Sequence, residues 1–227
     1  MTVKDYYKQE AREIYDDIIN SHSTKEKITI KGIDLYVLPH VYPSDKFRTT
    51  NFVLESIEPL VANATVCDMG CGLGIVGQFA LRHGAAKVLQ VDINPHAVEN
   101  ASLNKAFHGF SDDQLMVCKS DCFESVPLQK FDLIVFNMPF HTENHEIKDP
   151  LEHAFYDPLF RGLKKFLEQL PKYSHEKTLI TIAFSNKGNI AEIESIFNSY
   201  KLNWTLWKII NADKEYDNRI YLIKDVK

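Results

Sequence analysis

Residues 66–74 read Val-Cys-Asp-Met-Gly-Cys-Gly-Leu-Gly, and they join an apolar run to a stretch with helical periodicity. Glycines at such a junction let the backbone approach a ligand closely, and the start of the following helix offers free N–H groups to an anion. The next predicted strand ends at Asp92, where a carboxylate can accept hydrogen bonds from ribose hydroxyls. The stretch therefore indicates a cofactor that resembles a nucleotide.

The glycine spacing departs from the dinucleotide fingerprint G-x-G-x-x-G. That pattern needs Gly or Ala where Ile75 stands, and the third glycine of this chain falls one residue early, at Gly74. The spacing argues against a nicotinamide dinucleotide as the cofactor. An NAD-linked reductase stays an open alternative.

Short apolar runs alternate with helical patterns along the rest of the chain. This order predicts an α/β fold, a doubly wound and mostly parallel seven-stranded sheet with helices on both faces. The predicted strands are 65–67, 87–91, 115–118, 132–136, 178–184, 205–210 and 219–223. The predicted helices are 5–19, 75–83, 95–107, 154–170 and 189–200, with another helical pattern from Thr49. No helical pattern separates the last two strands, so they should form an antiparallel hairpin at one edge around 213–218.

The length of 227 residues allows one large domain with a modest appendage. Residues 1–45 are expected to form that appendage, a helix followed by two short strands that turn at Lys31-Gly32. Residues 46–227 are expected to form the cofactor-binding domain.

Composition excludes several classes of function. The formal net charge of −5 at pH 7 gives no global attraction to nucleic acid or to an anionic membrane. The first twenty residues are charged throughout, and no window approaches the roughly 18 apolar residues of a membrane span. We therefore expect a cytoplasmic protein without a membrane partner, whose four cysteines are reduced and hold no metal.

Four motifs follow the predicted strands in order. They are Asp68-x-Gly70-x-Gly72-x-Gly74, Asp92-Ile93-Asn94-Pro95, Ser120-Asp121-Cys122 and Asn137-Met138-Pro139-Phe140. The ordered set, from about residue 47 to 227, resembles class I S-adenosylmethionine-dependent methyltransferases. The fourth motif resembles the N-P-P-[YF] signature of amino methyltransferases, particularly the methyltransferase small domain and HemK-like groups. The ribosomal protein L11 methyltransferase group lacks that motif and is a weaker match.

The resemblance implies S-adenosylmethionine as cofactor and assigns residues to it. The glycines would lie against its methionine portion, Asp92 would bind the ribose, and Asp121 would accept from the adenine amino group. The implied cofactor residues are Asp68, Gly70, Gly72, Gly74, Asp92, Ile93, Asp121, Cys122 and Asn137.

The resemblance also implies a catalytic turn made of Asn137, Met138, Pro139 and Phe140. The Asn137 side chain and the Met138 carbonyl would accept hydrogen bonds from a planar NH2 group, and Phe140 would stack on the substrate. Met138 stands where the family has its first proline, so this turn lacks the fixed φ angle that a proline provides. A binding module that holds the cofactor without catalysis therefore stays an alternative.

Three residues are assigned to the entrance of the site. Arg48 and Thr49 precede the helical pattern that should close over the methionine end, where Arg48 could pair with a carboxylate. His141 is a candidate acceptor for the proton of the product, and the polar segment 141–149 is expected to be a mobile substrate loop.

The sequence says least about the methyl acceptor. A nucleobase NH2 group in RNA or DNA is slightly favoured on family grounds, and a protein amide or amine or a small molecule are the alternatives. Acidic residues between Glu143 and Asp149 argue against a phosphate backbone. The oligomeric state stays open.

Overall fold

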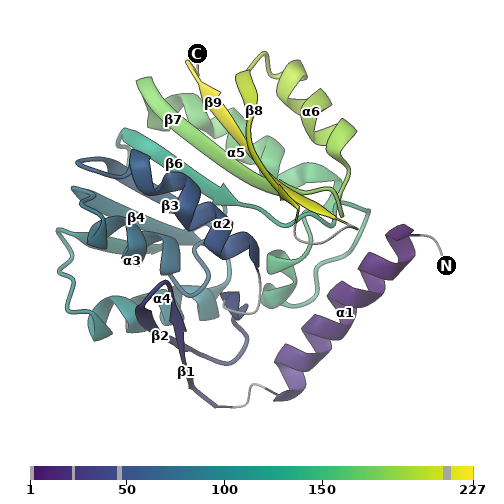
Figure 1. Ribbon diagram of the computed structural model, residues 1–227, viewed down its shortest axis with the longest axis horizontal. Coiled ribbons are helices and arrows are strands. Elements are labelled where there is room, and N and C mark those ends of the chain that lie inside the picture. The colour runs from purple at the N-terminus through teal and green to yellow at the C-terminus, as the bar shows by residue number, and fades with distance from the viewer. Residues whose placement is uncertain (1–2, 22–23, 45–47, 212–215, 227) are drawn as a thin grey trace.

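The computed structural model describes residues 3–21, 24–44, 48–211 and 216–226. Its centre is a seven-stranded sheet with the strand order β5-β4-β3-β6-β7-β9-β8 (Figure 1). The strands are β3 (Thr65–Met69), β4 (Lys87–Asp92), β5 (Leu115–Lys119), β6 (Phe131–Asn137), β7 (Ser174–Ser185), β8 (Asn203–Asn211) and β9 (Asp217–Lys224). The first five pair in parallel, whereas β9 is antiparallel to both β7 and β8. The predicted fold class and its antiparallel hairpin are confirmed.

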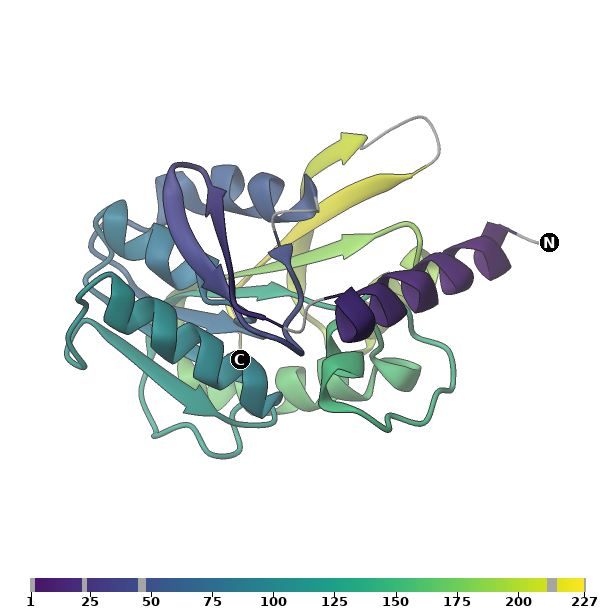
Figure 2. The same ribbon diagram turned by 90° about the horizontal axis from the view of Figure 1, so that it is seen from below.

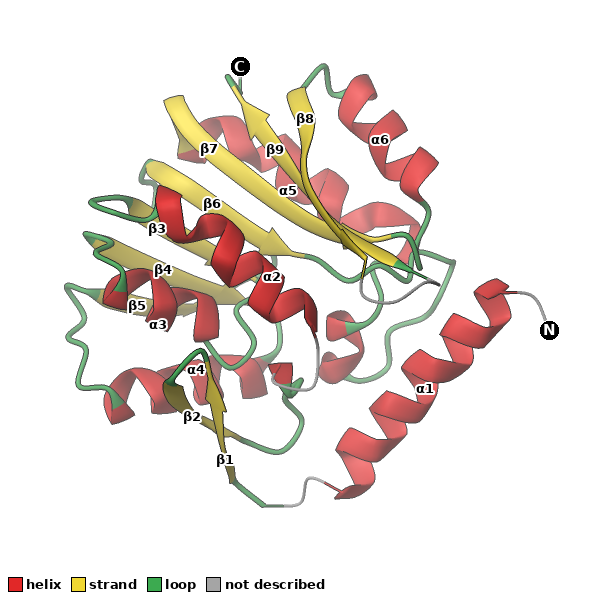
Figure 3. Ribbon diagram, in the orientation of Figure 1, coloured by secondary structure: helices red, strands yellow, loops and turns green. Residues whose placement is uncertain are grey.

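Successive side chains of the parallel strands enter two different core clusters. Val66 and Leu133 pack with α2 (Arg48–Ile57) and α3 (Ile75–Arg82) on one face of the sheet. Their neighbours Cys67 and Ile134 pack with α5 (Arg161–Tyr173) and α6 (Ile190–Ser199) on the other face (Figure 3). Because both faces are covered, these strands are apolar on both sides, which explains why they read as continuous apolar runs.

The first part of the chain forms the predicted helix and hairpin. These are α1 (Val3–Ser21), β1 (Glu26–Ile30) and β2 (Ile33–Val37), with Lys31 and Gly32 in the left-handed turn. Helix α4 (Pro95–Phe107) holds the hairpin, because its Asn100 and Asn104 side-chain amides both donate to the Tyr36 carbonyl, at 2.8 and 2.9 Å. The domain boundary at residue 45 stays a prediction, and residues 45–47 lie outside the described part of the chain.

Helix α1 lies beside the sheet and does not cover either face (Figures 1 and 2). Its Ala11 and Ile18 are buried against Leu151 and Phe155, in a small cluster of their own. Glu10 of α1 also forms an ion pair of 2.6 Å with Lys187, which follows β7. The helix is thus packed on the loop after β6, at the carboxyl edge of the sheet.

The predicted helix 154–170 is wrong at its start. Two 3-10 helices occupy Pro150–Ala154 and Pro158–Phe160, and α5 begins at Arg161. Leu159 and Phe160 adopt left-handed φ angles of 56° and 54°, which an α-helix cannot continue through. Phe160 is completely buried, so tertiary packing overrides the helical periodicity of this stretch. None of the helices in the described ranges is long and apolar enough to cross a membrane.

Candidate active site

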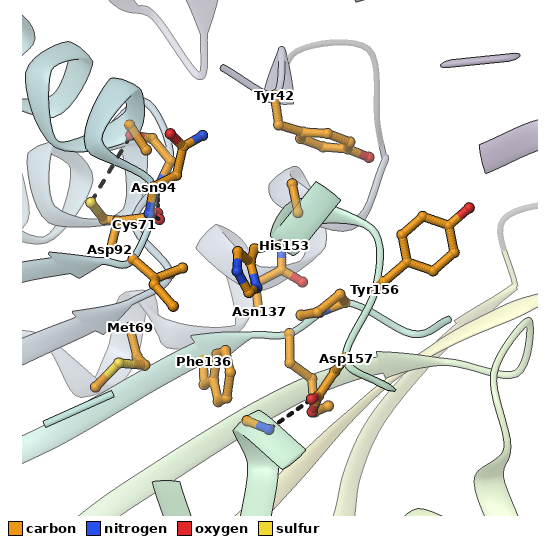
Figure 4. A pocket seen from close by; sticks show the side chains of 18 of the residues that line it. Tyr42, Met69, Cys71, Asp92, Asn94, Phe136, Asn137, His153, Tyr156 and Asp157 are labelled. Carbon is orange, nitrogen blue, oxygen red and sulfur yellow. Dashed lines mark hydrogen bonds between the residues drawn. The ribbon is translucent and has the colours of Figure 1, made fainter. Parts of the chain in front are cut away.

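A cavity of about 610 Å³ opens at the carboxyl edge of the sheet, where the chain order reverses between β3 and β6. Open α/β sheets bind their ligands at this position. Figure 4 shows the side chains around this cavity, which we call the edge cavity. The predicted residues that line it are Thr49, Asp68, Gly70, Gly72, Asp92, Ile93, Asp121, Cys122, Asn137, Met138, Pro139 and Phe140.

Two predicted residues, Gly74 and His141, lie outside the lining, and the prediction for Arg48 is not tested. Gly74 is the N-cap of α3 and lies behind the cavity lining, where an added β-carbon would be 3.0 Å from the Gln90 amide. His141 is buried outside the lining. Arg48 begins α2, but its side chain is outside the described part of the structure. Thr49 lies inside the helix, where its hydroxyl donates to Asn218 of β9 at 3.1 Å.

The loop after β3 turns toward β4 through its own backbone. The amides of Gly70 and Cys71 both donate to the Val91 carbonyl, at 2.8 and 3.0 Å. Gly72 has a φ of 55°, and apart from its two chain neighbours no residue has an atom within 4 Å of the position that a β-carbon would take. Glycine adopts this left-handed conformation more readily than other residues, and its bare backbone borders open space. The loop can therefore receive a ligand against its main chain.

The buried side chain of Asp68 stabilises the glycine loop through hydrogen bonds. Its carboxylate accepts from the Gly77 amide at 3.2 Å and from the Gln90 side chain at 3.0 Å. The same Gln90 nitrogen also donates to the Gly74 carbonyl at 2.7 Å. Burial raises the pKa of Asp68 to about 7, although the hydrogen bonds from Gly77 and Gln90 to its carboxylate lower the pKa. The three side-chain contacts tie the glycine loop to α3 and β4.

Asp92, the last residue of β4, links the glycine loop to the next turn. Its carboxylate accepts from the Gly72 amide at 2.8 Å and from the Asn94 amide at 2.9 Å. Burial raises the pKa of Asp92, while these backbone donors lower it. The Asn94 side chain caps α4 by accepting from the His96 amide at 2.9 Å. It also donates to the His40 carbonyl at 3.1 Å, which positions the segment after β2 on the cavity.

Asp121 and Cys122 follow β5 and also line the cavity. Lys165 of α5 forms ion pairs with Asp121 and with Glu124, the second at 2.6 Å. Cys122 has a φ of 51°, and its thiol donates to the Gly162 carbonyl at 3.4 Å. An adenine amino group at Asp121 would share that carboxylate with Lys165. Sequence reasoning missed this lysine because it lies 44 positions further along the chain and no motif marks it.

The Asn137–Phe140 turn leaves β6 at the centre of the cavity. Asn137 is exposed to the cavity, whereas Met138 is 2% exposed and belongs to the core cluster under α5. Burial of the Met138 side chain anchors the turn where the related motif uses proline to fix φ. Phe140 is half-buried, and Gly188 packs so closely that an added β-carbon would stand 2.3 Å from the Phe140 carbonyl oxygen.

Residues 141–157 form a loop that is closed by its own backbone. The His141 amide donates to the Phe155 carbonyl at 3.2 Å, and the Asp157 amide donates to the His141 carbonyl at 2.9 Å. Inside the loop, Glu152 accepts from the Lys148 amide at 3.0 Å and lies 3.0 Å from the His145 ring nitrogen. The predicted polar segment thus lines the cavity as a loop with fixed internal contacts.

Sequence reasoning did not assign four other side chains that line the cavity. They are Tyr42, His153, Tyr156 and Asp157 (Figure 4). Burial raises the pKa of Tyr42 well above its usual range, raises the pKa values of Tyr156 and Asp157, and lowers the pKa of His153. Burial therefore favours the neutral form of each group. The motifs begin at Asp68 and end at Phe140, so they give no signal for Tyr42 or for residues 153–157.

Within the described ranges, no group of three or more His, Cys, Asp or Glu side chains is placed to hold a metal ion. Cys67, Cys71, Cys118 and Cys122 are free thiols.

Solved structures with the same fold define the class. A ribosomal protein L11 methylase from Lactobacillus delbrueckii subsp. bulgaricus superposes with a TM-score of 0.59 and 23% identity, over 78% of this chain and 79% of that one. The 16S rRNA N2 G1207 methyltransferase of T. thermophilus, solved with AdoMet and guanosine, has a TM-score of 0.65 and 17% identity, over 89% of this chain and 50% of that one. The fold is that of class I methyltransferases.

The family model of the methyltransferase small domain matches residues 32–165, and the chain belongs to this family. A Methanocaldococcus jannaschii protein, provisionally named a protein N5-glutamine methyltransferase, is 34% identical over 70% of this chain and 79% of its own length. The ribosomal RNA small subunit methyltransferase C of Haemophilus influenzae is 35% identical over 55% of this chain. The chain covers 37% of that relative's length. The predicted family, its enzymatic class and its cofactor S-adenosylmethionine are confirmed.

Proposed function

We propose that the protein transfers a methyl group from S-adenosylmethionine to a planar NH2 nitrogen, with the side-chain amide of a protein as acceptor. One observation carries the proposal. Asn137 and Phe140 line the same cavity as the glycine loop, so a cofactor and a flat acceptor can meet there. At about 610 Å³ the cavity falls within the usual range for small-molecule sites.

The residues present fit the cofactor. Gly72 offers bare backbone beside open space, and Asp92 uses its two oxygens for one amide donor each. A carboxylate has about four acceptor positions, so two remain for the ribose hydroxyls. When bound, S-adenosylmethionine supplies a methyl group that is already activated by its positive sulfur.

The catalytic turn orients the acceptor. In this proposal the Asn137 side-chain oxygen and the Met138 carbonyl accept hydrogen bonds from the two N–H groups of the acceptor. This arrangement directs the nitrogen lone pair toward the methyl group and stabilises the positive charge that develops on nitrogen. Phe140, held by the core behind it, covers one flat face of the acceptor.

Charge at the cavity favours a protein acceptor. Glu146 is exposed on the lining, and Glu143 and Asp149 flank it in the same loop. These carboxylates would repel a phosphate backbone. The relative with the greater coverage is provisionally named for protein glutamine, which also supports this choice.

A nucleobase amine is the second candidate, and the rRNA methyltransferases among the relatives support it. Exposed Arg161 also lines the cavity and could meet a phosphate. The slight preference for nucleic acid inferred from the sequence is not carried into this proposal, and the cytoplasmic location stays a prediction.

Labelled S-adenosylmethionine and cell extract separate the two acceptors. After incubation, aliquots are treated with ribonuclease, deoxyribonuclease or protease. We expect the macromolecular label to survive both nucleases and to disappear with protease. Label that is lost with a nuclease instead would assign the acceptor to nucleic acid.

Asn137→Ala tests the catalytic turn itself. Loss of one orienting acceptor should lower methyl transfer by about 10²-fold, while cofactor affinity measured by calorimetry stays within a few-fold. Wild-type turnover in this variant would contradict the proposed mechanism.

A further inference from the structure

His153 is a titratable side chain of the edge cavity that the mechanism above leaves unused. It lies in the 3-10 helix Pro150–Ala154, is half-buried, and lines the cavity together with Asn137. In Figure 4 its ring projects into the middle of the cavity, on the side of Asn137. A substrate group bound at the Asn137 turn would therefore lie beside the His153 ring.

Methyl transfer to an NH2 group creates a proton that must leave. The nitrogen lone pair forms the new N–C bond, the S–C bond breaks, and its electron pair stays on sulfur as a neutral thioether. The nitrogen then carries a positive charge and one hydrogen too many. An amide or aromatic amine is a poor base, so a neutral base beside the nitrogen assists the step by accepting that proton.

The two other histidines near the turn are committed elsewhere. His141 does not line the cavity. His145 also lines the cavity, but it is stacked on Tyr156 with ring centroids 4.2 Å apart, and its ring nitrogen lies 3.0 Å from Glu152.

Charged groups from three elements act on His153. Burial lowers its pKa, whereas the carboxylates of Asp121, Asp157 and Glu152 raise it by smaller amounts. The cations Lys165 and Arg161 of α5 line the same cavity, and Lys165 is neutralised by its pairs with Asp121 and Glu124. The ring is therefore a neutral acceptor near pH 7. Once it holds a proton, the three carboxylates stabilise the imidazolium until water removes the proton.

We propose that His153 accepts the proton that the acceptor nitrogen releases during methyl transfer. This inference rests on the proposed function, because it requires an acceptor nitrogen at Asn137. It assigns His153 a direct contact with the substrate.

The test compares His153→Gln with His175→Gln. His175 lies at the opposite, amino-terminal edge of the sheet, where it contacts Asp132 at 3.0 Å, and its variant serves as the matched control. Initial rates are measured with labelled S-adenosylmethionine and extract proteins from pH 5 to 9. We expect His153→Gln to lower the rate by about 10²-fold and to lose the acid limb of the pH profile. Cofactor affinity by calorimetry should stay within a few-fold of wild type in both variants.

A second readout does not depend on activity. In NMR spectra of the free protein, the His153 imidazole is identified by its absence from the His153→Gln spectrum and is titrated with acid. We expect it to titrate below the ordinary histidine value of about 6.5. His153→Asn supplies the same comparison if the glutamine variant does not fold.

Two outcomes would overturn the inference. One is wild-type activity with an unchanged acid limb in His153→Gln, which would leave the methyltransferase proposal intact. The other is an imidazole that titrates above about pH 8, because such a ring is about nine-tenths protonated at pH 7 and accepts no further proton. A wild-type protein that methylates no fraction of the extract would contradict the proposed function, while the titration still tests His153.

Discussion

Asp68→Asn should change how the stability of the protein depends on pH. The folded pKa of Asp68 is about 7, whereas the ordinary value is 3.8, because burial disfavours the charged form. The folded state therefore holds this proton more tightly than the unfolded chain does. The associated stability is fully present below the unfolded pKa and is lost as the pH rises through the folded pKa.

The shift of about three pH units corresponds to about 4 kcal/mol, which is an upper bound on the loss between about pH 4 and pH 8. Asparagine removes the charge and keeps an oxygen that can accept from Gly77 and Gln90. Wild type and variant should thus be similar at pH 4, and the variant should be more stable at pH 8 by up to about 4 kcal/mol.

Urea unfolding measured at half-unit pH steps gives this difference directly, because both proteins expose the same surface on unfolding. Asp113→Asn is the control, since Asp113 is exposed in the turn before β5. The reasoning is refuted if the free-energy difference between wild type and Asp68→Asn is flat from pH 4 to pH 8. A flat difference would mean that Asp68 is charged in the folded state without cost.

Two further substitutions test other parts of the edge cavity. Asp92→Ala should weaken S-adenosylmethionine binding by about 1–3 kcal/mol, roughly 5- to 150-fold by calorimetry, and an unchanged affinity would show that the ribose assignment is wrong. Gly188→Ala should destabilise the fold by about 1–3 kcal/mol in urea unfolding and lower methyl transfer. Its β-carbon would stand 2.3 Å from the Phe140 carbonyl oxygen, so the turn must move, and a variant with wild-type stability and rate would contradict this packing.

The sheet could be predicted from sequence because its signals are local. Each parallel strand contains an apolar run that ends close to a polar or turn residue, such as Asp92 at the end of β4 or Gly70 directly after β3. The start of α5 could not be predicted in the same way. Residues 154–160 have apolar side chains at helical spacing, yet burial of Phe160 and the left-handed Leu159 decide their conformation. Those constraints come from side chains that are distant in sequence.

The candidate site shows the same difference between features that local sequence predicts and features that depend on residues distant in sequence. Most residues named by the motifs line the cavity, because the carboxyl ends of parallel strands meet at one edge. Lys165 reaches Asp121 only through the packing of α5, and Tyr42 reaches the cavity because Asn94, Asn100 and Asn104 hold the segment around the hairpin. The spacing of residues within one motif cannot predict the positions of Lys165 and Tyr42.

The two sides of the cavity are consequently built in different ways. The glycine loop is held within the sheet, by Asp68, Gln90 and Asp92. The acceptor side depends on packing between separate segments, because α1 supports the 141–157 loop and its Glu10 pairs with Lys187, next to the Gly188 that contacts Phe140. Changes in these packed segments can reshape the acceptor side while the hydrogen bonds of the glycine loop stay intact. We infer that the choice of acceptor resides in α1 and the 141–157 loop, and that the choice of cofactor resides in the ends of β3 and β4.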